Sequence, residues 1–161
     1  MKAKYLVVTL LILSHFLACT SISGHVTVEE DVVEPPPVNF KSRFKTLEEW
    51  LTYIYRNERP SKTIDTYNFG LFEGQDNYTL YLTGTNTYET SKDHSQIRIE
   101  FSPDELYFSL PETDFKGLKR EEIYAKITSQ LKEFMKTDTY KNSFFIKTTH
   151  VKTEWNGETW P

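Results

Sequence analysis

The chain has 161 residues, of which 19 are basic and 23 acidic, so its net charge is −4 at neutral pH. This length suits one domain that buries a core without disulfides or a structural metal. The acidic balance argues against nucleic-acid binding, because phosphate contacts rely on clustered lysine and arginine side chains. The single cysteine excludes a disulfide within the chain.

The first 18 residues have the pattern of a secretory signal peptide. A positively charged start is followed by an apolar run from Tyr5 to Leu13. Ser14 and His15 end this run well short of the roughly 20 apolar residues that a membrane-spanning helix needs. We therefore expect residues 1–18 to direct export and to be removed.

A lipobox-like motif follows at the only cysteine, and its residues are Phe16, Leu17, Ala18 and Cys19. It resembles the processing site of bacterial lipoproteins. The resemblance implies cleavage after Ala18, acylation of Cys19 and a lipid anchor in the cell envelope, with the protein facing the periplasm. The alternative is that Cys19 only ends the apolar run and that cleavage after Ser23 gives a secreted or soluble periplasmic form.

Residues 19–40 are predicted to form a lipidated tether without a fold of its own. Four acidic residues between positions 29 and 34 repel one another, and Pro35 to Pro37 favour an extended polyproline conformation. A short edge strand from His25 to Val28 is the competing interpretation. The remaining residues, 41–161, are predicted to form a single domain.

Two helices are predicted in this domain. The first begins with a capping box at Thr46 and Glu49, has apolar residues at helical spacing behind it, and ends before Pro60. The second runs from about Lys119 to Lys136, with acidic residues at its positive amino end.

Strands are predicted from apolar and polar residues that alternate with a period of two, in residues 67–71, 78–83, 97–101 and 106–110. Residues 89–95 are predicted to be a polar loop. A final strand is expected through Phe144 to Ile146, continuing toward residue 151. A tight turn at Asn156 and Gly157 would then bring Trp155 and Trp160 together.

The resulting order, α-β-β-β-β-α-β, predicts an α+β fold. We expect an antiparallel sheet of about five strands with both helices packed on one face.

No catalytic, cofactor-binding or metal-binding motif stands out in the sequence. His25, His94 and His150 have no ligand partners at metal spacing, and the glycines do not cluster into a phosphate-binding loop. The paired acids at residues 104–105 and 121–122 fall in a turn and at a helix start, where acids have structural roles. We therefore expect a protein that is not an enzyme and has neither cofactor nor metal.

The solvent-facing side of the predicted sheet is the candidate partner-binding surface. If Leu80, Ile99 and Phe108 point inward, the outward residues are Tyr81, Arg98, Glu100 and Tyr107. Tyrosine and arginine are enriched at protein-binding hot spots. The competing interpretation is that these side chains only pack across the strands, as on any exposed antiparallel face.

These features favour a non-catalytic envelope lipoprotein that binds another protein. Its layout of lipobox, short tether and one acidic α+β domain resembles that of immunity proteins, which neutralise toxins delivered into the periplasm. The first alternative is a housekeeping envelope-assembly or adaptor lipoprotein. A small hydrolase or ligand carrier is a further alternative, and it would need a deep pocket with convergent polar groups.

Overall fold

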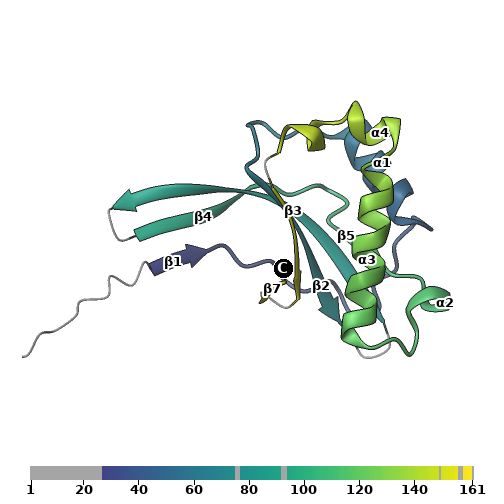
Figure 1. The fold of residues 1–161 in the computed structure, drawn as a ribbon. Coiled ribbons are helices and arrows are strands. Elements are labelled where there is room, and N and C mark those ends of the chain that lie inside the picture. Colours follow the sequence, from purple (N-terminus) through teal and green to yellow (C-terminus); the bar gives the residue numbers. More distant parts are fainter. Residues whose placement is uncertain (1–26, 75–76, 92–93, 149, 156–157, 161) are drawn as a thin grey trace, which may run out of the picture.

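The structure is a computed structural model that describes residues 27–74, 77–91, 94–148, 150–155 and 158–160 (Figure 1). It has an α+β fold, as predicted. In chain order the elements are β1 (Thr27–Glu30), α1 (Leu47–Asn57), β2 (Thr66–Glu73), β3 (Tyr78–Ser91), β4 (His94–Phe101), β5 (Tyr107–Ser109), α2 (Glu112–Phe115), α3 (Arg120–Phe134), α4 (Asp138–Lys141), the 3-10 helix η1 (Phe144–Lys147), β6 (His150–Trp155) and β7 (Glu158–Trp160).

Seven strands form one mixed sheet in the order β1-β4-β3-β2-β6-β7, and β5 pairs with β3 beside β4. The pairs within the β2–β5 meander and the β6–β7 pair are antiparallel, whereas β1 pairs parallel with β4 and β6 parallel with β2. The prediction of a purely antiparallel sheet is therefore wrong at two pairings. A parallel neighbour needs a long crossover, and between β2 and β6 that connection includes α3.

The two predicted helices are confirmed, and they cover one face of the sheet (Figure 1). Thr46 Oγ1 accepts the Glu49 amide at 3.1 Å, while the Glu49 carboxylate accepts the Lys45 amide at 2.9 Å. Trp50 is fully buried, and its ring stacks on Phe108 with centroids 5.6 Å apart. These contacts join α1 to the sheet within one apolar core that also includes α3.

The segment predicted as the final strand is instead helical. Phe144 to Ile146 belong to η1, where Ser143 Oγ accepts the Phe145 amide at 3.2 Å, and the strand β6 begins only at His150. A short apolar run does not distinguish a strand from a buried helical turn, and here Phe145 packs its ring edge-on to Tyr67.

The predicted turn at residues 156–157 lies outside the described residues. The strands on either side of it do pair, with Trp155 opposite Glu158 and Trp160 opposite Thr153. The two tryptophans are therefore not direct partners across the β6–β7 pair.

The predicted polar loop at residues 89–95 is largely a continuation of strands. β3 extends to Ser91 and β4 starts at His94, although β3 pairs with β2 only as far as Thr85. Beyond that point, β3 and β4 form a hairpin arm that projects away from the helices (Figure 1). The arm is defined here as residues 86–91 and 94–98.

The N-terminal strap, residues 27–42, is part of the fold and not a free tether. Its first four residues form β1 along the outer edge of β4. The Asp31 carboxylate then accepts the Ile99 amide at 2.9 Å, and the Glu34 carbonyl accepts the Tyr107 hydroxyl at 2.7 Å. An edge strand therefore forms at Thr27–Glu30, two residues later than the predicted one, whose first two residues lie outside the described residues. Repulsion between acidic residues did not prevent it, because strand pairing uses backbone groups.

Candidate partner-binding surface

Two of the four predicted site residues lie side by side on one face of the sheet, where the strap contacts Tyr107. Tyr81 and Tyr107 are direct partners across the β3–β5 pair, on the sheet face opposite the helices. Tyr81 is only 5% exposed and packs over Gly70, which has no side chain to obstruct the ring. Burial, and then the nearby Glu34 carboxylate, raise the pKa of Tyr107. Both tyrosines therefore pack within the protein and do not form an open binding face.

Arg98 and Glu100 lie on the other side of the sheet. Arg98 is opposite Asn86 in the β3–β4 register, and an even-numbered residue of β3 points away from the face of Tyr81. A β-bulge puts them there. Gly84 pairs with Phe101 but Thr85 pairs with Ile99, so Glu100 is an extra residue that shifts the register of β4 by one. The expectation that all four candidates share one face, with Ile99 pointing inward, is therefore wrong.

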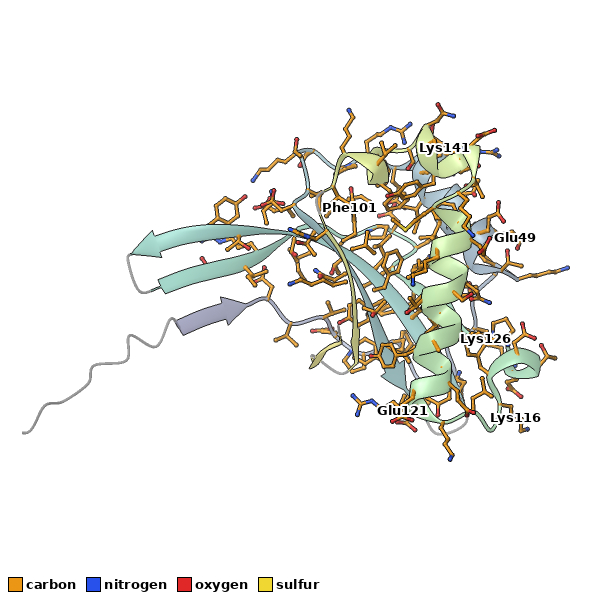
Figure 2. All side chains as sticks on the ribbon, in the orientation of Figure 1. Glu49, Phe101, Lys116, Glu121, Lys126 and Lys141 are labelled. Carbon is orange, nitrogen blue, oxygen red and sulfur yellow. The ribbon has the colours of Figure 1, made fainter. Side chains whose placement is uncertain are left out.

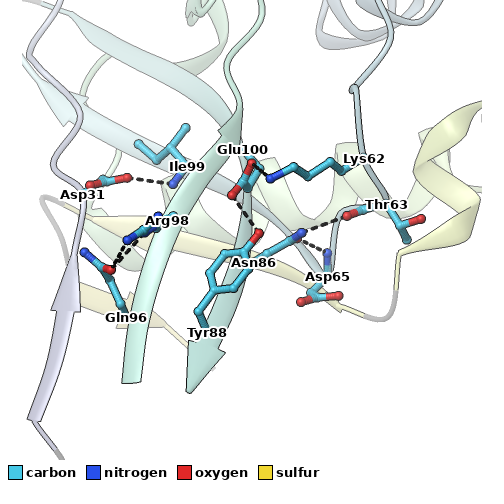
Figure 3. Close-up of polar contacts among 10 residues, drawn as sticks. All are labelled: Asp31, Lys62, Thr63, Asp65, Asn86, Tyr88, Gln96, Arg98, Ile99 and Glu100. Atoms are coloured by element: carbon cyan, nitrogen blue, oxygen red, sulfur yellow. Dashed lines mark hydrogen bonds and ion pairs between the residues drawn. The ribbon is translucent and has the colours of Figure 1, made fainter. Parts of the chain in front are cut away.

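Around Glu100 the structure forms a polar group that we call the Glu100 cluster, composed of Lys62, Tyr88, Arg98 and Glu100 (Figure 3). The Tyr88 hydroxyl donates to Glu100 Oε1 at 2.7 Å, and Lys62 Nζ lies 2.8 Å from Glu100 Oε2. The Tyr88 ring is flanked by two cations, with Lys62 Nζ 6.0 Å and Arg98 Cζ 5.8 Å from its centroid. Both distances are within the range of a cation–π contact.

The electrostatics of the cluster favour fixed charges. The Lys62 ammonium, and next the Tyr88 hydroxyl, hold the pKa of Glu100 below its usual value. The same carboxylate raises the pKa of Lys62. Both shifts move the pKa further from pH 7, so both groups stay ionised near pH 7 and the pair is not tuned for proton transfer. Its chemistry is that of a positioned ion pair.

Neighbouring side chains hold the cluster in place (Figure 3). Asn86 Nδ2 donates to the Thr63 carbonyl at 2.9 Å, and Asn86 Oδ1 accepts the Asp65 amide at 2.8 Å. These two bonds fasten the loop that carries Lys62 to β3. On the arm itself, Arg98 donates through Nε and Nη2 to Gln96 Oε1 at 2.9 and 2.7 Å.

Sequence reasoning missed Lys62 and Tyr88. Lys62 lies 38 residues before Glu100 in a loop without a motif, and Tyr88 adjoins a segment that was predicted to be a loop. No spacing rule connects residues so far apart, and only the β3–β4 register brings them together.

The concave features of the surface differ in size and polarity. A small cavity of about 20 Å³ has only apolar surface, with Leu51, Met135 and Val151 among its lining residues, and has room for about one water molecule. A groove of about 510 Å³ runs between the strap and the β2–β3 turn, with Phe72, Asn77 and Glu112 along it. The groove is open and mixed in polarity, with no convergent set of buried polar groups.

Other predictions concern metal sites and the amino end. Within the described ranges, no three histidine, cysteine or acidic side chains gather as a metal site would require. No helix in the part of the chain that the structure describes is long and apolar enough to cross a membrane. Cys19 and His25 lie outside the described residues, and His150 is exposed on β6.

Figure 2 shows that charged side chains such as Glu49, Lys116, Glu121 and Lys141 are spread around the helical end of the molecule. Comparison with protein-family models, with curated proteins and with solved structures finds no match to this chain.

Proposed function

We propose that the chain is a non-catalytic envelope lipoprotein that binds another protein through the Glu100 cluster and the adjoining arm. The observation behind this proposal is the Tyr88 ring, which is held by its bond to Glu100 and flanked by Lys62 and Arg98. Tyrosine and arginine are typical hot-spot residues, and side chains already fixed lose less conformational entropy on binding.

The class of partner that we propose is a toxin delivered into the periplasm, which would make this chain an immunity protein. Such a protein needs only a rigid, complementary surface, and the hydrogen bonds of Asn86 and Gln96 give the cluster that rigidity. Loss of palmitate labelling in Cys19→Ser would support the lipid anchor, whereas unchanged labelling would contradict it.

A pull-down from envelope extracts tests partner binding. The bait should start directly after Cys19. A shorter bait that removes the whole acidic and proline-rich segment would lose β1 and the contact of Glu34 with Tyr107. We expect one stoichiometric partner, whose gene lies beside this one, and protection of cells from that partner by the full-length protein. Retention of several envelope-assembly proteins would instead favour the adaptor alternative.

Arg98→Glu is the variant that locates the surface. The Arg98 side chain is exposed, and its hydrogen bonds go to Gln96, a neighbour on the same strand. We therefore expect the free energy of unfolding of the variant to change by no more than about 0.5 kcal/mol. Capture of the partner should fall at least tenfold, since a charge of the wrong sign opposes binding.

Arg56→Glu, an equivalent charge reversal at an exposed position on α1, is the matched control and should retain the partner. Equal losses for both variants would mean that overall charge, and not the Glu100 cluster, determines capture.

A further inference from the structure

The chain enters the folded domain at the tip of the arm. β1 runs parallel to β4, and Thr27, the first described residue, is opposite His94, the first residue of β4. On the other side of β4, His94 pairs with Ser91, the last residue of β3. The strap then runs from the arm tip toward the body of the sheet, as its successive bonds to Ile99, Tyr107 and Ser109 show.

The packed strap leaves a short link to the predicted anchor. Eight residue steps separate Cys19 from Thr27, and a fully extended chain covers at most about 3.5 Å per step, or about 28 Å in all. Seven further steps along β4, from His94 to Phe101, add about 23 Å at the strand rise of about 3.3 Å per residue. The arm tip is therefore the part of the fold that the anchor holds nearest to its attachment point.

We propose that the tip of the β3–β4 arm faces the lipid bilayer surface and that the helical end of the domain points away from it. This inference rests on the proposed lipid anchor at Cys19. The occupant facing the tip is the membrane surface and not a protein.

The negative charge of the strap favours an arm that rests at the bilayer surface over one that inserts into the bilayer. Glu29, Glu30 and Asp31 follow one another along the arm, and anionic headgroups repel them. In this orientation the Glu100 cluster lies at the base of the arm, raised above the headgroups and accessible to a partner in solution.

Fluorescence quenching in vesicles tests the orientation. The acylated mature protein is placed in vesicles of phosphatidylethanolamine and phosphatidylglycerol that contain a lipid with a nitroxide on its headgroup. Acylation occupies the Cys19 sulfur, so an introduced cysteine is the only thiol available for the fluorophore. The label sites are Ser91→Cys at the arm tip and two exposed positions at the other end, Glu112→Cys on α2 and Lys141→Cys on α4.

We expect quenching at Ser91→Cys to exceed that at the two distal sites several-fold. Equal quenching at all three sites, or stronger quenching at a distal site, would overturn the orientation. A flexible Gly-Ser insertion between Ser23 and Gly24 that doubles the linker is the matched control. It leaves the folded domain unchanged and should reduce the difference between sites, because a longer linker permits more orientations.

The fraction of protein that stays with the vesicles distinguishes failure of the lipid anchor from failure of the orientation. If the acylated protein does not stay with the vesicles, the lipid anchor itself is wrong, and the orientation inference fails with it. If the protein is anchored but shows no site dependence, only the orientation is wrong.

Discussion

Gly70 should be intolerant of any side chain because of its neighbour across the sheet. Gly70 and Tyr81 are direct partners in the β2–β3 pair, and a β-carbon at position 70 would fall within the Tyr81 ring. The ring is buried, and its centroid lies 5.1 Å from that of Phe72. Gly70→Ala must therefore displace the ring. The chain should still fold, because the obstacle is the end of a side chain and not backbone.

The expected magnitude follows from two opposing effects. Exposing a buried aromatic side chain costs about 1.5–3 kcal/mol. Alanine is more favourable than glycine within a strand by about 0.5–1 kcal/mol. The net loss in the free energy of unfolding is therefore about 0.5–2.5 kcal/mol, or a fall in Tm of roughly 2–10 °C for a domain of this size.

A double-mutant cycle with Tyr81→Val, followed by urea unfolding, measures the effect. Valine keeps the preference for a strand but removes the ring, so Gly70→Ala should be neutral or stabilising in that background. The same loss in both backgrounds would refute the argument. It would mean that Gly70 is needed for its backbone and that Tyr81 does not occupy the space above it.

Two further predictions concern single side chains. Trp50→Phe keeps most of the core packing but removes the hydrogen bond that Trp50 Nε1 donates to the Glu105 carbonyl at 2.7 Å. Urea unfolding should show that the free energy of unfolding falls by about 1–3 kcal/mol, and an unchanged midpoint would contradict this. Glu58 follows the last residue of α1, and its burial raises the pKa of its carboxyl group in the folded protein. The protonated side chain therefore favours folding below the pKa of the unfolded chain, and this stabilisation is lost as pH rises through the folded pKa. Glu58→Gln should therefore raise Tm at pH 7 by about 1–2 °C, and this gain should disappear near pH 4; an equal gain at both pH values would contradict it.

Local signals predicted the helices well. The capping residues Thr46 and Glu49 form bonds within their own turn, so neighbouring residues contain all the information that they need. The apolar stripe behind them and the period-two segments of the meander are likewise properties of short stretches of chain. The same is not true of Phe144 and Phe145, whose aromatic rings find their partners in distant strands.

The candidate site was predicted only in part, and the reason is the bulge in β4. Strict alternation placed Arg98 and Glu100 together, and they do lie together in the Glu100 cluster. Alternation could not indicate that Glu100 is an extra residue opposite Thr85, nor that the strap packs on Tyr107. A change of one residue in register moves side chains to the opposite face.

The amino-acid sequence by itself determined the α+β class, the two helices and the meander, because each depends on contacts between residues close in the chain. Only the tertiary structure decided the parallel positions of β1 and β6, the covering of the second face by the strap and the meeting of Lys62 with Glu100. These features depend on which backbone groups and side chains, far apart in the sequence, form hydrogen bonds and ion pairs in the folded protein. Hydrophobic periodicity along the chain does not specify those pairings.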